Sequence, residues 1–170
     1  MQLDTFYDEG VDFSRLKTYQ WMSDRQIITG DERIRNEIIM SMIKEAIDDG
    51  LKSKGFTQAE SNADFLVGYH AAVSSKLDVR TMNDYYGYGV PRIAGSAYGP
   101  GWRTSGEVRT EVHRYDQGTL IIDIAQASDR KLIWRGSAED RVTPGQTDQD
   151  EKRKRIREGT NRILESFPPK

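Results

Sequence analysis

Cysteine is absent from the 170-residue chain, which excludes disulfide bonds, thiolate catalysis and thiolate metal ligands. Histidine is nearly as scarce, with only His70 and His113, which lie far apart in the sequence. Two distant histidines cannot form an HxxxH or HExxH motif, so a metal site would need carboxylates such as Asp64 or Asp123 to join them. We therefore expect neither a bound metal nor a cofactor.

A basic excess is also missing. The chain has 25 Lys and Arg against 27 Asp and Glu, a formal net charge of -2. Nucleic-acid binding relies on neutralising phosphates, so we expect no nucleic-acid partner. The sharpest local feature is the basic run 152–157, which could contact anionic lipid head groups or nucleic acid. Acidic residues flank it (Asp148, Asp150, Glu151 and Glu158), and this flanking favours a solvated helix face.

Long apolar runs are lacking as well. No segment approaches the roughly 20 apolar residues of a membrane span. No signal peptide precedes Gln2, although a mature domain with an added start Met would look the same. The composition, 36% hydrophobic and 31% charged, is typical of a globular protein with a well-solvated surface. We expect residues 1–170 to form a single domain.

Catalytic and nucleotide-binding motifs are not found. There is no GxSxG elbow, and Ser96 lies in a loop without the strand-turn-helix setting that exposes a nucleophile. The segment 87–89 (GYG) lacks the third glycine of a dinucleotide fingerprint, and there is no P-loop. These absences predict a protein that is not an enzyme.

One pair of carboxylates deserves separate consideration. Asp123 and Glu139 lie on the two strands of a predicted hairpin, where they could face each other as an acid/base pair. The more common arrangement leaves such carboxylates solvated or paired with a cation, here Lys131 or Arg135. The sequence alone leaves both arrangements open.

The hydrophobic pattern predicts several strands and two main helices. The first helix, 31–54, has apolar residues at three- and four-residue steps, with Asp31 as N-cap and Gly55 just past its end. The second, about 148–166, has a narrow apolar stripe ended by prolines. Strands are predicted at 2–7, 17–22, 56–58, 65–74, 107–113, 119–127 and 131–139. Without repeated βαβ alternation, we expect an α+β fold, an antiparallel sheet with both helices packed on one face.

Two residues of the predicted hairpin point to the core. Trp134 follows a Leu-Ile pair and is expected to be buried, where an aromatic ring contributes a large apolar area. Gly136, two residues later, is expected to permit close packing beside it.

The best candidate for binding is a long loop at about 78–105, rich in glycine and aromatic residues. Loops of this length are uncommon in a compact domain unless they are functional or disordered. Tyr and Trp are favoured at binding surfaces because they offer a large contact area with few rotatable bonds. The candidate binding residues are Tyr85, Tyr86, Tyr88, Tyr98 and Trp102. An insertion without a binding role is the alternative.

Four segments carry a family resemblance. They are 12–21 (DFSRLKTYQW), 51–56 followed by 63–70 (ADFLVGYH), 118–123 with 132–136 (LIWRG), and the closing 163–169 (ILESFPP). In this order and spacing, the chain resembles a family of bacterial envelope lipoproteins catalogued as domain of unknown function 4136. The resemblance spans nearly the whole chain and supplies no catalytic residue.

The resemblance implies a periplasmic protein, anchored to the outer membrane by a lipid on a cysteine ahead of this segment. We therefore expect a non-enzymatic envelope domain that binds an unknown envelope protein or ligand, or supports an envelope assembly. One alternative is a small-molecule or glycan-binding module that uses the aromatic loop. Another is an uncharacterised hydrolase, which convergent Asp, His and Ser side chains in a cleft would favour.

Overall fold

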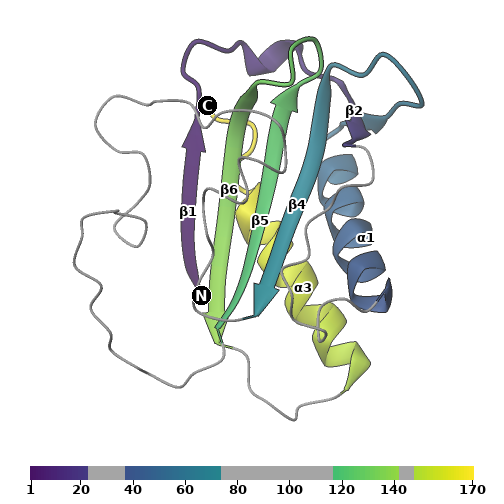
Figure 1. Ribbon diagram of the computed structural model, residues 1–170, viewed down its shortest axis with the longest axis vertical. Helices are drawn as coiled ribbons and strands as arrows, with labels where there is room; N and C mark the ends of the chain where they lie inside the picture. The colour runs from purple at the N-terminus through teal and green to yellow at the C-terminus, as the bar shows by residue number, and fades with distance from the viewer. Residues whose placement is uncertain (23–36, 74–116, 142–147) are drawn as a thin grey trace, which may run out of the picture.

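A twisted sheet and two helices make up the described part of the chain. The computed structural model describes residues 1–22, 37–73, 117–141 and 148–170 (Figure 1). In chain order the elements are β1 (Gln2–Tyr7), the 3-10 turn η1 (Phe13–Arg15), β2 (Thr18–Trp21), α1 (Glu37–Ser53), β3 (Thr57–Gln58), β4 (Phe65–Val73), β5 (Gln117–Gln126), β6 (Leu132–Arg141) and α3 (Gln149–Leu164). The hairpin of β5 and β6 and both helices agree with prediction. The strand predicted at 107–113 lies outside the described residues.

The sheet is mixed, and the prediction of an antiparallel sheet is wrong. Its strand order is β1-β6-β5-β4-β2-β3. β1, β6, β5 and β4 pair antiparallel, whereas β2 pairs parallel with both β4 and β3. The connection from β2 to β4 includes α1, and a helical crossover returns the next strand in the same direction. This single βαβ unit does not produce the repeated alternation on which the prediction relied.

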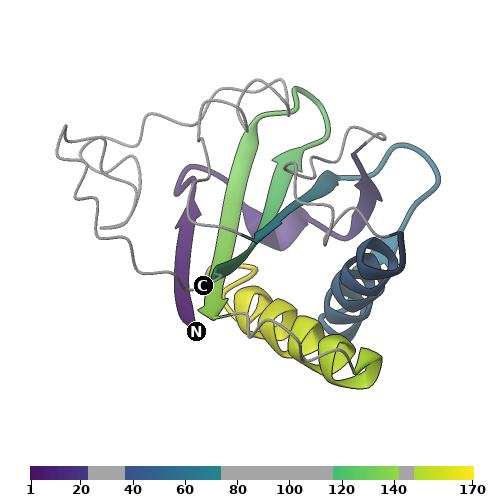
Figure 2. The same cartoon turned by 60° about the horizontal axis from the view of Figure 1, so that its bottom comes forward.

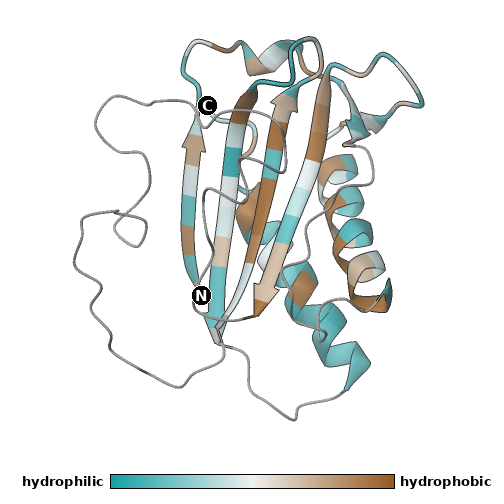
Figure 3. Cartoon of the chain, viewed as in Figure 1, coloured by the Kyte–Doolittle hydropathy of each residue, from teal (hydrophilic) through white to brown (hydrophobic). Residues whose placement is uncertain are grey.

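Both helices cover the same face of the sheet, as predicted, and the described part of the chain therefore has two layers (Figure 2). The core lies between these layers. Ile43, Ile47 and Leu51 of α1 pack with Ile163 and Leu164 of α3 against every second residue of the central strands. Figure 3 shows the corresponding pattern, with brown apolar bands on the strands and a largely polar outer surface on α3.

Local signals in the sequence determine where the helices begin and end. Gly55 follows α1 with φ of +90°, a conformation that glycine adopts without steric cost. Phe56 N–H donates to Leu51 O and Gly55 N–H to Lys52 O, which together form a Schellman motif. At the start of α3, Asp148 accepts a hydrogen bond from the backbone N–H of Asp150. The predicted start of the first helix, Asp31, lies outside the described residues.

Aromatic rings fill one end of the core. The Phe167 ring, just beyond α3, lies 5.1 Å from the Trp134 ring and 5.4 Å from the Phe56 ring, measured between centroids. The Phe65 and Phe13 rings complete the cluster, at 5.8 and 6.1 Å from Phe167. Pairs at these separations add to the gain from burial. The C-terminal segment thereby closes this end of the core.

A shared carboxylate ties β2 to α1. Asp48 Oδ1 accepts hydrogen bonds from the Tyr19 hydroxyl at 2.7 Å and from the Trp21 indole N–H at 3.0 Å. Burial, reinforced by the Asp48 hydrogen bond, raises the pKa of the Tyr19 phenol above its usual value. The Lys44 ammonium lies 5.1 Å from the centre of the Trp21 ring, within cation–π range. Two side chains of α1 and two of β2 thus fix the position of this short strand.

Candidate functional site

The aromatic residues predicted to bind a partner fall in a part of the chain without a described structure. Tyr85, Tyr86, Tyr88, Tyr98 and Trp102 all lie between residues 74 and 116, outside the described residues. Their grouping and their role stay predictions.

The second sheet face, opposite the helices, carries a buried ion pair. Arg135 Nε donates to Asp123 Oδ1 at 2.6 Å, and its Nη2 donates to Oδ2 at 2.9 Å. Asp123 has no exposed surface and Arg135 is 5% exposed. A two-bond contact of this kind holds a carboxylate in a fixed orientation. Of the two arrangements that the sequence left open, pairing with Arg135 is the one observed.

The strand register separates the carboxylates that were considered as an acid/base pair. Asp123 lies opposite Arg135, whereas Glu139 lies opposite Thr119, four residues further along β5. At about 3.4 Å per residue, this offset is roughly 13 Å. General acid/base catalysis by these two groups on one small substrate is therefore not supported.

The register also separates a histidine from a serine on the same face. His70 of β4 and Ser137 of β6 are both buried, and both lie opposite Ile121 of the intervening β5. Two strand spacings place them roughly 10 Å apart, too far for a nucleophile–base hydrogen bond. Within the described ranges, no three His, Asp or Glu side chains gather as a metal site would require. His113 lies outside those ranges.

Two carboxylates in loops beside the sheet, Asp8 and Asp64, have lowered pKa values, and both bind structural partners. Asp64 Oδ2 accepts from the backbone N–H groups of Thr18 and Lys17 at 2.9 and 2.8 Å, and these bonds lower its pKa. The Lys131 ammonium, 2.6 Å from Asp8 Oδ2, lowers the pKa of that carboxyl. Asp64 borders an open groove of about 640 Å³. Because it is already engaged in joining β2 to the β3–β4 connection, it is unsuited to acid/base chemistry.

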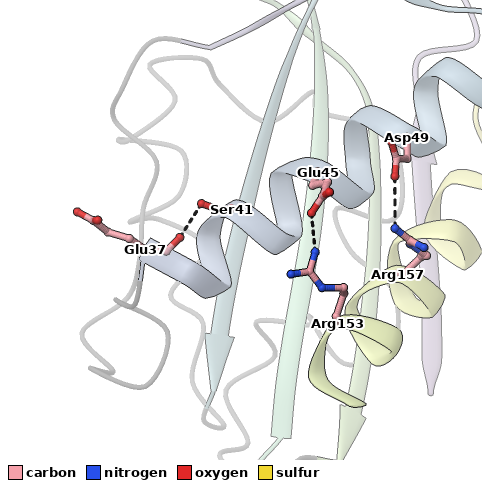
Figure 4. Close-up of polar contacts among 6 residues, drawn as sticks. All are labelled: Glu37, Ser41, Glu45, Asp49, Arg153 and Arg157. Atoms are coloured by element: carbon pink, nitrogen blue, oxygen red, sulfur yellow. Dashed lines mark hydrogen bonds and ion pairs between the residues drawn. The ribbon is translucent and has the colours of Figure 1, made fainter. Parts of the chain in front are cut away.

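The basic run of α3 faces acidic residues of α1. Arg153 donates to Glu45 at 2.8 Å and Arg157 to Asp49 at 3.5 Å, as Figure 4 shows. Arg155 pairs with Glu151 within α3 at 3.4 Å. The predicted solvated, ion-paired helix face agrees with these contacts. The partners on α1 were not anticipated, because sequence spacing indicates only pairs within one helix.

The strand β1 forms one edge of the sheet (Figure 1). Asp8 N–H, just after β1, donates to Ile133 O, so by alternation the N–H and C=O groups of Leu3, Thr5 and Tyr7 point away from β6. In the described part of the chain no strand pairs with this outer side. Leu3 and Tyr7 are 44% and 39% exposed. Exposed edge groups beside exposed apolar side chains can accept another strand.

Edge strands usually carry features that prevent such pairing, and β1 has few of them. Lysine, proline and β-bulges are the common protective devices. β1 reads QLDTFY, with one charge at Asp4, and its pairing with β6 continues over six residue pairs without a register shift. This edge is therefore the surface of the described structure best suited to binding a protein.

None of the described helices is long and apolar enough to span a membrane. Within the described residues, the fold and these surfaces define a small α+β domain with a mixed sheet, two helices on one face and an edge strand, β1, whose outer side pairs with no other strand. The chain belongs to the family known as domain of unknown function 4136, whose model matches residues 3–169. No curated protein matches it in sequence.

Two solved structures are similar to this fold at low sequence identity. A PDZ domain protein from Parabacteroides distasonis matches with a TM-score of 0.55 and 15% identity, over 99% of this chain. This chain spans 35% of that protein's length. A PelC dodecamer from Paraburkholderia phytofirmans matches with a TM-score of 0.51 and 8% identity, over 96% of each chain. At these identities the similarity concerns the fold alone.

Proposed function

We propose that this domain is a non-enzymatic module of the cell envelope that associates with a second copy of itself through β1. The observation that carries the proposal is the unprotected edge, with its outward N–H and C=O groups and its exposed Leu3 and Tyr7. Buried polar groups on the sheet support the non-enzymatic part, because their partners and separations suit structure rather than catalysis.

A second copy is the partner that best complements this strand. When two β1 strands pair antiparallel about Thr5, Leu3 of one copy lies opposite Tyr7 of the other. Asp4 then lies opposite Phe6, so the two like charges do not face each other. Such a pair is isologous and closed, and it joins two sheets into one. PelC, which shares the fold, forms a dodecamer, so self-association is compatible with this architecture.

Sedimentation velocity over a range of protein concentrations tests the association. One short strand buries a small area, so we expect weak, concentration-dependent dimers. Leu3→Lys places a charge on the exposed edge and should give a monomer at every concentration. Leu3→Pro removes an outward N–H group without adding charge and should do the same.

The matched control is Ile38→Lys on α1, which makes the same kind of change at a side chain that is 49% exposed. It should leave the dimer intact. A wild-type chain that stays monomeric, or equal effects of Leu3→Lys and Ile38→Lys, would contradict the proposal.

The envelope location rests on the family resemblance, with a lipid anchor on a cysteine ahead of this segment and attachment to the outer membrane. Fractionation of the native host with an antibody to this domain tests it. We expect the protein in the outer-membrane fraction, released only by detergent. Recovery in the cytosolic fraction would contradict the location and leave the edge proposal standing.

A further inference from the structure

An apolar cavity of about 240 Å³ lies between the sheet and the first halves of the two helices. Ile39 and Ile43 of α1, Ile156 and Gly159 of α3, and Leu120 of β5 are among the residues that line it. Arg153 pairs with Glu45, and Arg157, four residues later in α3, pairs with Asp49, four residues later in α1. The two helices therefore run in the same direction. Both helices begin at the end of the sheet away from the C-terminus (Figure 1), so the cavity that their first halves line lies opposite the aromatic cluster around Phe167.

The sequence produces this cavity through the sizes of the core side chains. At this end the helix-facing positions of two strands are small, Ala71 in β4 and Ala138 in β6, whereas Phe65 and Trp134 occupy the other end. β5 likewise has Gly118 at this end and Ile124 at the other. Small side chains at this end leave a space between the sheet and the helices that is open to solvent at one side. A concave and mostly apolar surface with a few charged groups at its mouth is the usual setting of a small-molecule site.

The mouth of the cavity has charged residues of both signs, and most are already paired. Asp140 lies 3.4 Å from the N-terminal amine of Met1, and Glu151 lies 3.4 Å from Arg155. Lys152 also lines the mouth, and among the described residues no ion pair is recorded for it. Lys152 is therefore the cation available to an incoming anion.

We propose that this cavity binds the alkyl chain of a single-tailed anionic amphiphile, a medium-chain monocarboxylate, with its carboxylate at Lys152. An engineered cavity of about 150 Å³ takes benzene, and by the same scaling about 240 Å³ takes a chain of roughly ten carbons. The unpaired cation at the mouth complements a terminal carboxylate.

The chemistry of the walls disfavours other small ligands. Beyond the mouth, the helix-facing side chains are aliphatic or absent, as at Ile43, Leu120 and Ala138. A sugar or a nucleotide base would lose its water there without gaining hydrogen bonds in return. A lipid with two full-length tails exceeds the volume. The proposal is independent of the β1 edge and of the envelope location.

Calorimetric titration of the whole chain with decanoate, below its aggregation threshold, tests the binding. We expect saturation at one decanoate per chain. Hexanoate should bind at least tenfold more weakly, because each buried methylene contributes roughly a fourfold gain in affinity. Decyltrimethylammonium has an alkyl chain of closely similar length with a cationic head and should also bind at least tenfold more weakly than decanoate. Equal binding of the anionic and the cationic amphiphile, or no saturable binding of decanoate, would overturn the proposal.

Variants locate the site. Ala138→Leu fills the cavity from β6 and should reduce decanoate affinity at least tenfold without lowering the melting temperature. If that variant does not fold, Ala71→Leu fills the same space from β4. Lys152→Gln should weaken decanoate binding severalfold, whereas Lys154→Gln, an equal charge change at an exposed position on the same helix, should not.

Two further results would also overturn the assignment. One is full decanoate affinity in the folded, filled variant, which would place the ligand elsewhere. The other is binding to anionic vesicles that is unaffected by competing decanoate, which would assign the surface to a membrane. The Leu3→Pro chain provides a check on independence, since it adds no charge beside Ala138 and should bind decanoate like the wild type even if the proposed dimer proves wrong.

Discussion

Arg135 on β6 and Asp123 on β5 lie directly opposite each other and share two hydrogen bonds inside the sheet face that the helices leave uncovered. Removing one partner leaves the other charge buried. We therefore expect Arg135→Met to cost about 3–5 kcal/mol of unfolding free energy in urea titrations. Adding Asp123→Leu to that variant should restore part of the loss, because it removes the unpaired charge.

The control for this prediction is an exposed pair. Arg153→Met breaks the contact with Glu45, whose side chain is 55% exposed, and should cost under about 1 kcal/mol. If Arg135→Met proved as mild as Arg153→Met, the Asp123–Arg135 pair would contribute little to stability.

Trp134 is 1% exposed, as its sequence context predicts, and its indole N–H has no hydrogen-bond partner recorded in the described part of the chain. Trp134→Ala should cost about 3–5 kcal/mol through lost burial and the cavity that remains. Trp134→Phe should cost distinctly less, because it keeps a ring and gives up no hydrogen bond. Urea unfolding of both variants measures the difference, and equal losses would show that the indole N–H does have a partner.

Two helix glycines should respond in opposite ways to alanine. A Cβ at Gly159 of α3 would meet only the Met1 side chain, at an ordinary 3.8 Å. Gly159→Ala should therefore stabilise the protein by about 0.5–1 kcal/mol through helix propensity. A Cβ at Gly50 of α1 would lie 2.5 Å from Leu164 Cδ1, so the buried Leu164 side chain would have to shift. Gly50→Ala should be neutral or destabilising in thermal melts, and a gain equal to that of Gly159→Ala would be unexpected.

Local signals predicted the elements of this fold well, because capping, turns and hydrophobic periodicity act over a few residues. Gly55 after α1, the start of α3 near residue 148 and the hairpin of β5 and β6 stand where the sequence indicates. The close packing expected at Gly136 is confirmed as well, since a Cβ there would collide with Trp134 and Ile163. This packing could be predicted because Gly136 and Trp134 are only two residues apart on the same strand.

Local sequence signals could not predict the strand order or the ion pairs between the two helices. The parallel β2–β4 contact depends on a crossover that includes α1, and one βαβ unit among antiparallel strands leaves no periodic trace. The partners of Arg153 and Arg157 lie 108 residues away, on a different helix. The cavity was likewise overlooked, although the small residues that line it, Ala71, Gly118 and Ala138, are visible in the sequence once the helix-facing positions are known.

Because of Asp64, the unfolding free energy of the protein should depend on pH in the acidic range. Hydrogen bonds from the backbone N–H groups of Thr18 and Lys17 lower its pKa below the ordinary 3.8. A carboxyl whose pKa is lower in the folded state stabilises the protein at pH values above its ordinary pKa. At those pH values the carboxyl is charged in both states, but only the folded chain holds hydrogen-bond donors against it. As the pH falls from 3.8 toward the folded pKa, the unfolded chain takes up the proton first, and this stabilisation is lost.

Asp64→Asn tests this account through urea midpoints at two pH values. At about pH 7 the variant should be less stable than the wild type, and at about pH 3 the difference should shrink. Glu60→Gln makes the same charge change nearby, at a carboxylate for which no hydrogen bond is recorded in the described structure, and should be close to neutral at both pH values. A difference between Asp64→Asn and wild type that stays constant with pH would mean that Asp64 acts through the shape of its loop and not through its charge.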